Sequence, residues 1–372
     1  MLKKLLRYSV IGFLTLGILL TLATILVLRL PQFGVAPSGA YLESLRKSPQ
    51  HNGEVFENEG KIELEMSSKF GEMINAYMNL PEGMRPDSLP ILHPDIEDVA
   101  EDTSGEYHLT WFGHSAFLLE VDNKHILLDP ALGPSASPFS FQVTRFNPKL
   151  PIALEELPEI DAIVFSHDHY DHLDYSTILA LKDKVKRYFV PLGLKGHLVH
   201  WGVDSNLISE LDWWQEAKLD DFSFACTPSQ HFSGRSLNDR GATLWCSWVI
   251  DTPKKKIFFS GDSGYFKGFK EIGEKYGPFD LALLECGQYN KMWKEIHMMP
   301  EETAMAAVDL GAKQMMPIHW GMFELAIHPW KEPAQRVVVK AEELHMPILT
   351  PRVGQRLSLV EPTSTEHWWE SL

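Results

Sequence analysis

The sequence has little cysteine. Three cysteines occur in 372 residues, the first at Cys226, and none has the CxxC spacing of a thiolate zinc site. An odd number cannot pair fully within one chain, which argues against a disulfide framework. The late position of Cys226 also excludes a lipoprotein signal. Cys226 and Cys246 lie in apolar runs, so we expect buried free thiols.

Positive charge is in deficit. The 34 lysines and arginines are outnumbered by 50 aspartates and glutamates, which gives a formal net charge of -16. Because phosphate backbones are bound by a surplus of Lys and Arg, this balance argues against a nucleic-acid partner. The sequence also lacks a Gly-x-Ser-x-Gly nucleophile elbow, so no serine nucleophile is predicted. The length and the 44% hydrophobic content are sufficient for a large core.

One long apolar run lies near the N-terminus. Tyr8 to Leu28 carries no charge, and Lys3, Lys4 and Arg7 precede it. In a helix, at about 1.5 Å per residue, this run spans the roughly 30 Å hydrocarbon core of a bilayer, whereas a signal peptide has a shorter apolar region. Residues 1–30 are therefore predicted to be an uncleaved single-pass membrane anchor. The positive-inside tendency places the remainder on the non-cytoplasmic, periplasmic side, although cations after the run weaken this orientation.

The stretch from Ile163 to Leu173 organises the rest of the chain. An apolar, strand-like run ends there in six residues that contain three histidines and two aspartates. Imidazole and carboxylate are donors that Zn²⁺ prefers, and the His-x-His-x-Asp-His spacing is too tight for one tetrahedral ion but suits two. A polar turn with incidental histidines is the alternative. Three further donors favour the metal interpretation, because each follows an apolar run at a Gly- or Pro-rich turn: His231, Asp262 and His319.

These motifs resemble the metallo-β-lactamase superfamily, and more narrowly its branch of N-acylphosphatidylethanolamine-hydrolysing phospholipases D. The resemblance covers about residues 105 to 345. It rests on six separated motifs in the expected order: Trp111-Phe112-Gly113-His114, Ser166 to Tyr175, Val190 to Leu194, Glu210 to Trp214, Thr227 to His231, and Ile318-His319-Trp320-Gly321. The implied fold is an α/β, four-layer αββα sandwich.

The resemblance also implies a metal site with two Zn²⁺ per chain. One ion is expected on His167, His169 and His231, the other on Asp171, His172 and His319, with Asp262 bridging them. The chemistry expected there is hydrolysis by a hydroxide formed from bound water, whose pKa falls from ~15.7 towards ~7. The catalytic residues expected are Asp171, Asp262 and His297.

Several neighbouring side chains remain open to two interpretations. His297 precedes a helix that begins Pro300-Glu301-Glu302, and it either binds substrate and transfers a proton or lies on a surface loop. Asp129 either supports the metal loop, which we define as residues 167–173, or closes an Asx turn. His114 either approaches the site or caps a turn. The side chain of Asp168 is expected to point away from both metals, or at most to serve as a distant base.

The rest of the chain divides into a linker and one catalytic domain. Residues 31–104 are predicted as a linker with some helix that wraps the main domain, and residues 105–362 as the metallo-β-lactamase domain. Strands are expected at residues 107–112, 116–121, 125–128, 187–191, 222–227, 244–250, 256–260, 281–284 and 314–318, and helices at 176–184, 194–201, 267–276, 300–310 and 334–344.

The function that these features favour is a phospholipase D-type phosphodiesterase acting on a phospholipid at the membrane. A lactonase or amidase that hydrolyses a soluble small molecule on the same fold is the first alternative. A noncatalytic metal-binding envelope protein is the second. The expected partners are a phospholipid or small-molecule ester and a membrane, and an oligomer is compatible with the sequence.

Overall fold

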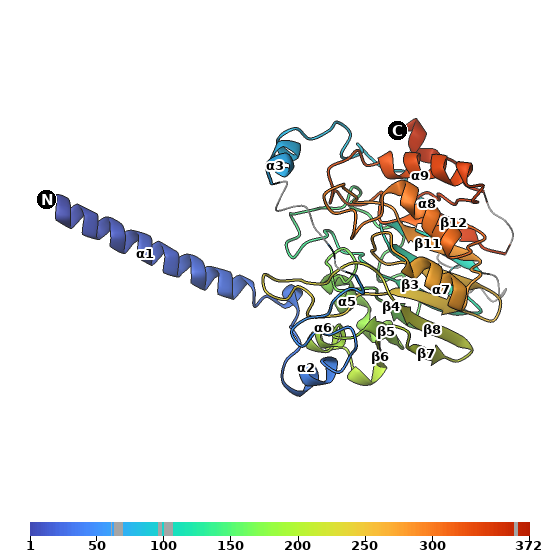
Figure 1. The fold of residues 1–372 in the computed structure, drawn as a ribbon, viewed down its shortest axis with the longest axis horizontal. Helices are drawn as coiled ribbons and strands as arrows, with labels where there is room; N and C mark the ends of the chain where they lie inside the picture. The colour runs from blue at the N-terminus through green and yellow to red at the C-terminus, as the bar shows by residue number, and fades with distance from the viewer. Residues whose placement is uncertain (61, 63–69, 96–98, 100–106, 361–363) are drawn as a thin grey trace.

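The protein, described here as a computed structural model, is built on two β-sheets packed face to face (Figure 1). The structure describes residues 1–372 except 61, 63–69, 96–98, 100–106 and 361–363. The first sheet has the strand order β13-β1-β2-β3-β4-β5-β6, and the second has the order β12-β11-β10-β9-β8-β7. The strands of the first sheet are β1 (His108–Gly113), β2 (Ala116–Val121), β3 (Lys124–Leu128), β4 (Ala162–Val164), β5 (Tyr188–Pro191), β6 (Ile208–Leu211) and β13 (Arg356–Ser358). Those of the second are β7 (Glu216–Leu219), β8 (Phe222–Thr227), β9 (Ser247–Asp251), β10 (Lys256–Phe259), β11 (Leu281–Glu285) and β12 (Met315–Ile318).

Helices cover the outer face of each sheet. One apolar cluster joins the first sheet to α5 (Tyr175–Leu181) and α6 (Lys195–His200). Another joins the second sheet to α7 (Gly268–Tyr276), α8 (Pro300–Asp309) and α9 (Glu332–Glu343). A third cluster fills the space between the sheets. This arrangement confirms the predicted four-layer αββα sandwich.

Alternation of apolar side chains builds the central core. Trp111 and Phe117 from the first sheet, and Phe224 and Trp248 from the second, point into the same buried cluster, while their strand neighbours face the helices. In each sheet the strands leading to the functional segments are parallel: β3 to β6 in the first and β10 to β12 in the second. Parallel strands end at a common edge, so the segments that follow them are brought together.

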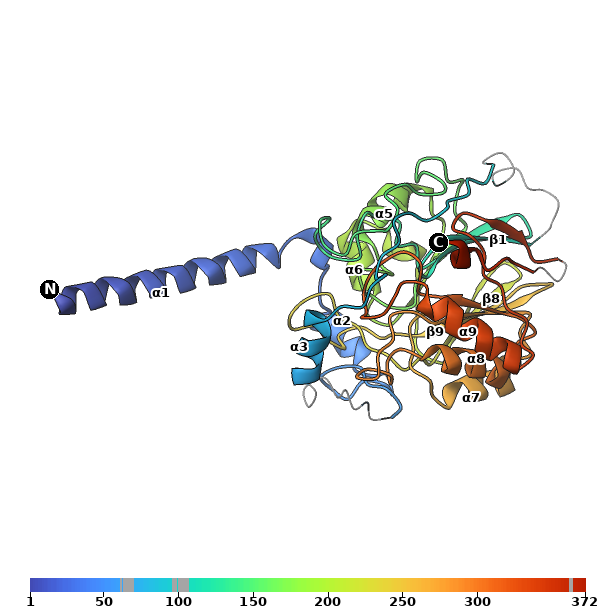
Figure 2. The same cartoon turned by 90° about the horizontal axis from the view of Figure 1, so that it is seen from above.

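The N-terminal residues form a projecting helix and a wrapping segment. Helix α1 (Leu2–Val27) extends away from the sandwich in both views (Figures 1 and 2). It contains a 24-residue apolar stretch, none of it buried, that is long enough to cross a membrane; a signal sequence passes the same criterion. Short helices follow at η1 (Pro31–Phe33), α2 (Gly39–Leu45) and α3 (Phe70–Met78). Leu45, Phe56 and Leu89 enter the central core, so the segment after α1 wraps the sandwich.

The observed elements differ from the predicted ones in five places. Residues 244–246 are not part of β9, because Leu244 N donates to Leu192 O and Cys246 N to Ser166 O in the first-sheet half. The polar strands β6 and β7 and the short β13 were not predicted. The C-terminal 3-10 helix η4 (Trp368–Ser371) was also missed, and it buries two tryptophans in the central core. The predicted boundaries at residues 104–105 and 362 lie outside the described residues.

Candidate metal centre

Three imidazoles converge at the end of β4 and the loop after β8. His167 Nε2 lies 2.8 Å from His169 Nδ1, and His231 Nε2 lies 3.2 Å from the same atom. The outer nitrogen of His231 faces the carbonyl of Ile296 at 2.9 Å, so it must carry the proton, which leaves a lone pair on Nε2. Converging lone pairs repel one another unless a cation or a proton lies between them.

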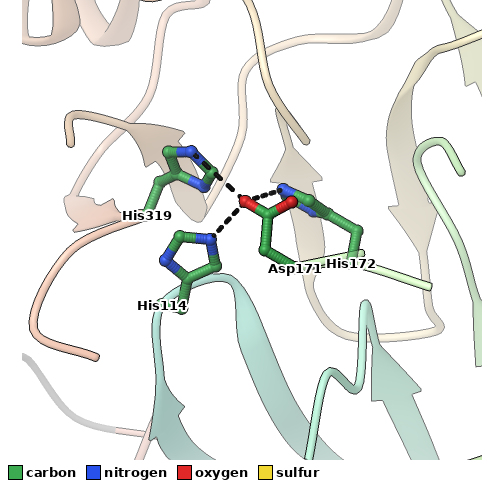
Figure 3. A group of neighbouring side chains, drawn as sticks. All are labelled: His114, Asp171, His172 and His319. Atoms are coloured by element: carbon green, nitrogen blue, oxygen red, sulfur yellow. Dashed lines mark hydrogen bonds and ion pairs between the residues drawn. The ribbon is translucent and has the colours of Figure 1, made fainter. Parts of the chain in front are cut away.

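Asp171 lies at the centre of a second cluster (Figure 3). Its Oδ2 is 2.9 Å from His114 Nε2, 3.6 Å from His172 Nε2 and 3.9 Å from His319 Nε2. His114 comes from the turn between β1 and β2, while His319 directly follows β12. The two turns are tied together, because His319 N donates to His114 O and His114 N donates to Trp320 O. The sequence left the role of His114 open, and the structure places it in this cluster.

Asp262 lies between the two clusters. Its Oδ2 faces the first at 3.8 Å from His167 Nε2 and 3.7 Å from His231 Nε2. Its Oδ1 faces the second at 3.2 Å from His172 Nε2 and 3.1 Å from His319 Nδ1. One carboxylate therefore presents one oxygen to each group of donors. All seven predicted ligand residues are brought together in this region.

Asp129 orients the metal loop from behind. Its carboxylate accepts hydrogen bonds from Ser166 N at 2.7 Å, from Ser166 Oγ and from His172 Nδ1 at 2.6 Å. The last bond places the proton of His172 on Nδ1 and turns Nε2 towards Asp262. Burial alone would lower the pKa of His172, but the carboxylates of Asp262, Asp171 and Asp129 raise it well above its usual value. The three carboxylates thus favour positive charge beside His172, as they would favour a metal ion.

The donors fit metal ions. His172 Nε2 and Asp262 Oδ1 are buried and lie 3.2 Å apart, yet they form no hydrogen bond with each other or with any other described residue. Such orphaned atoms are costly in a protein interior, unless an ion completes them. Two sets of four could each hold an ion, since one donor atom per residue lies within 4.8 Å of the others: His167, His169, His231 and Asp262; and His114, Asp171, His172 and His319.

Unusual backbone conformations accompany the site. His114, Asp129 and His319 have φ of 53°, 36° and 69°, in the left-handed region that non-glycine residues rarely adopt. Gly261, with φ of 55°, precedes Asp262 and approaches the metal loop so closely that an added Cβ would lie 2.4 Å from Ser166 Cβ. The close approach of the Asp262 loop to the metal loop therefore requires glycine at 261.

A buried carboxylate that the sequence analysis did not single out supports His297. Glu285, the last residue of β11, is fully buried, and its Oε1 lies 3.2 Å from His297 Nδ1. Its Oε2 accepts from Met298 N at 2.8 Å. Burial raises the pKa of Glu285 well above its usual value, and burial lowers the pKa of His297 to about 3. The only sequence signal was an acidic residue at the end of an otherwise apolar strand.

Asp168 points away from the donor clusters, as predicted. Its carboxylate is bonded to His197 Nε2 at 3.3 Å, to Thr243 Oγ1 at 3.0 Å and to Gly234 N at 2.8 Å. The buried guanidinium of Arg235 donates to the main-chain oxygens of Asp168 and Leu173, at 2.6 and 2.7 Å. Asp168 and Arg235 thus fix the metal loop at both of its ends.

A cavity of about 300 Å³ opens onto the donors. His297 lies on its wall, with the ring centroid 5.0 Å from that of His231 and 5.4 Å from that of His319. The other walls are mainly apolar or aromatic: Tyr77 of α3, Phe232, Trp293, Ile296 and Leu325. The cavity can therefore hold an ester beside both clusters, with apolar groups around it.

The fold and the metal centre agree with a match to a known protein family. Residues 124–320 match the family model of the beta-lactamase superfamily domain. The chain belongs to this superfamily and is a metal-dependent hydrolase of the metallo-β-lactamase fold.

The chain is similar to two relatives and to one solved structure. It is 43% identical over 286 residues to an uncharacterized protein of Mycobacterium tuberculosis, covering 76% of each chain. It is 34% identical over 299 residues to N-acyl-phosphatidylethanolamine-hydrolyzing phospholipase D 1 of Caenorhabditis elegans, covering 74% of this chain and 83% of that protein. The fold is similar to that of a metallo hydrolase from Ignicoccus hospitalis, with a TM-score of 0.52, 24% identity, and coverage of 68% and 97%.

Proposed function

We propose that the protein is a binuclear zinc-dependent phosphodiesterase that hydrolyses N-acylphosphatidylethanolamine-like phospholipids. The observation that carries this proposal is the Asp262 carboxylate, which offers one oxygen to each of two donor clusters on the floor of one cavity. A carboxylate in that position suits two ions about 3.5 to 4 Å apart, the arrangement used for phosphate ester hydrolysis. The relationship to the worm phospholipase D supports the lipid substrate.

The residues assigned to the ions follow from the clusters. His167, His169 and His231 would hold one zinc, and Asp171, His172 and His319 the other, with Asp262 shared. His114 would orient Asp171 by donating from Nε2 to Oδ2, at 2.9 Å. Zinc in these positions supplies Lewis acidity for a phosphoryl oxygen and lowers the pKa of a water towards ~7. Neutral imidazole donors suit this role, and burial lowers the pKa of His167 and His231 well below the usual value.

His297 and Glu285 would deliver a proton to the leaving alcohol. With Glu285 protonated and His297 neutral, the carboxyl O–H donates to Nδ1, and Nε2–H faces the cavity. When the P–O bond breaks, the Nε2 proton moves to the leaving oxygen. The Glu285 proton then moves to Nδ1, so His297 stays neutral and Glu285 becomes a carboxylate. His297 is the catalytic residue in this step, and Glu285 positions it.

The membrane assignment rests on α1. Its 24-residue apolar stretch would cross the bilayer with the N-terminal cations in the cytoplasm and the sandwich on the periplasmic side. The three natural cysteines are buried, so an exposed cysteine placed at Val339 gives a selective label. We expect a membrane-impermeant maleimide to label Val339→Cys before the inner membrane is opened. Labelling only after it is opened would contradict this orientation.

The substrate can be tested directly. Zinc-loaded full-length protein should release phosphatidic acid from N-acylphosphatidylethanolamine in mixed micelles, and Asp262→Asn should abolish the release. One observation favours a second candidate, a lactonase or amidase: the cavity of about 300 Å³ can hold a small soluble ester entirely. Faster turnover of soluble lactones than of any lipid diester would support that alternative and count against the phospholipase. If the metal-loaded protein hydrolyses none of these substrates, the result would support the third interpretation, a noncatalytic metal-binding protein.

A further inference from the structure

The base of α1 is fixed to the sandwich. Only three residues separate the end of α1 at Val27 from η1. Within η1, Gln32 Nε2 donates to Pro138 O at 3.0 Å, and Arg235 Nη2 donates to Gln32 O at 2.8 Å. Trp201 Nε1 donates to Pro31 O at 2.7 Å. A membrane entered by α1 would therefore lie close against the folded body, with no long linker between them.

The most exposed apolar side chains lie on the side of the sandwich from which α1 leaves. Among the described residues after position 30, the three large apolar side chains with the greatest exposure are Met78 at 78%, Phe141 at 77% and Leu237 at 74%. Scattered apolar residues are normal on a protein surface, but a group on one face indicates an interaction site. We refer to Met78, Phe141 and Leu237 together as the docking face.

Ring contacts, position in the chain and the position of α3 place the three members on the same side as α1. Phe141 stacks on Phe139 with centroids 5.7 Å apart, and Phe139 packs against Phe33 of η1 at 6.2 Å. Leu237 lies two residues after Arg235, which binds η1. Met78 ends α3, and α3 lies on the side from which α1 leaves in both views (Figures 1 and 2).

The cavity above the donor clusters opens near this face. Tyr77, next to Met78 on α3, lines the cavity together with His169 and Asp171. On the other side of the loop, Tyr170 packs against Phe33 of η1, with ring centroids 6.3 Å apart. The metal loop is therefore flanked by α3 and by the base of α1.

We propose that the docking face rests on the lipid bilayer that α1 enters, so that the cavity opens towards lipid head groups. This inference deepens the proposed function and rests on its membrane assignment for α1. The partner is a lipid surface rather than a second copy of the chain, because the short, hydrogen-bonded connection to α1 leaves little room for another protein. With a net charge of -16, the contact is apolar, so it forms on zwitterionic phosphatidylcholine without anionic lipid.

Environment-sensitive fluorophores on single cysteines test the contact. The variants Met78→Cys, Phe141→Cys and Leu237→Cys are labelled in the full-length protein, reconstituted into phosphatidylcholine vesicles. The matched controls are Val339→Cys on α9 and Val308→Cys on α8, which are 57% and 48% exposed and lie on helices remote from α1. We expect a spin-labelled phosphatidylcholine to quench the three docking-face labels several-fold more than the controls, and iodide to quench the controls more.

Two outcomes would overturn the proposal. Equal iodide quenching at all five positions would mean that the docking face stays in water. Protection of the docking face from both quenchers would assign it to another protein chain. Because the quenching measurements involve no catalysis, their result does not depend on which substrate the protein hydrolyses.

A kinetic comparison separates this inference from the substrate assignment. The double variant Phe141→Ser/Leu237→Ser should raise the apparent KM for a vesicle-borne phosphodiester about tenfold, since each side chain loses part of its apolar burial. Its kcat on a soluble short-chain diester should match that of the parent. Equal loss on both substrates would count against a docking role. If the parent turns over neither substrate, the proposed function fails, while the quenching result still decides the docking face.

Discussion

Glu285 Oε1 and His297 Nδ1 lie 3.2 Å apart beside the metal centre, in a contact that joins a fully buried carboxyl group to a partly exposed imidazole. Glu285 ends β11, and in the parallel β11–β12 pair it lies opposite Ile318, the residue before His319. The carboxyl group therefore occupies a fixed position in the sheet. His297, by contrast, lies on a loop, and its ring orientation depends on this contact.

Replacing Glu285 by glutamine should impair hydrolysis of diesters with poor leaving groups. The amide of the variant has no acidic proton to pass to His297 Nδ1, so proton delivery to an alkyl alcohol should fail, with kcat falling about 10²- to 10⁴-fold. A nitrophenyl diester, whose leaving group needs no proton, should be turned over nearly as fast as by the parent. Glu301→Gln on α8 is the matched control. An equal fall for both diesters would indicate structural damage rather than lost proton delivery.

Replacing Asp129 by asparagine should weaken metal binding. The amide can no longer accept hydrogen bonds from both Ser166 and His172 with two oxygens, so His172 loses its fixed orientation. Removal of such supporting groups typically lowers metal affinity about 10- to 100-fold. Competition with a chromophoric zinc chelator measures the change. The control is Asp161→Asn. The carboxylate of Asp161 directly precedes β4 and accepts a hydrogen bond from His125 N, so this variant should bind zinc like the parent. Unchanged affinity in Asp129→Asn would refute the orienting role.

Much of the centre could be predicted from sequence because its donors follow recognisable strands. His231, Asp262 and His319 each come soon after an apolar strand, and the ends of β8, β10 and β12 bring them to His167. Glu285 could not be found this way, since its partner His297 is selected by the fold of the intervening loop. The same limit applies to β13, which pairs with β1 across more than half of the chain.

Replacing Asp168 by asparagine should destabilise the fold in a pH-dependent way. Burial alone would raise the pKa of Asp168, but the hydrogen bond from His197, the nearby imidazoles of His197 and His169 and the hydrogen bond from Gly234 N together outweigh burial and lower the pKa to about 2. A carboxyl whose pKa falls from 3.8 to about 2 on folding contributes about 2 kcal/mol to the free energy of unfolding. This contribution is fully present above pH ~4 and is lost as the pH falls towards about 2.

Urea unfolding of both chains in the presence of a chelator measures this difference. We expect Asp168→Asn to lose about 2 kcal/mol at pH 7, and the gap between the two chains to narrow below pH ~4. Asp220→Asn, at an exposed carboxylate, should unfold like the parent at each pH. A gap that stays constant down to pH ~2 would show that the loss at pH 7 does not arise from the charge of Asp168.

Replacing Trp369 by alanine tests whether the C-terminal helix η4 belongs to the folding unit. Trp369 is 1% exposed and packs edge-on against Trp320, with centroids 5.5 Å apart, and Trp320 directly follows His319. Replacing the indole side chain by a methyl group should lower the free energy of unfolding by about 3 to 5 kcal/mol, because it leaves a cavity. Trp369→Phe should cost far less, since Nε1 of Trp369 has no hydrogen-bond partner among the described residues. Leu372→Ala, at a half-exposed side chain, is the control. Equal urea midpoints for Trp369→Ala and the control would exclude η4 from the cooperative core. A large loss of unfolding free energy in Trp369→Ala alone would show that the sandwich depends on η4, which packs against the residue that follows His319.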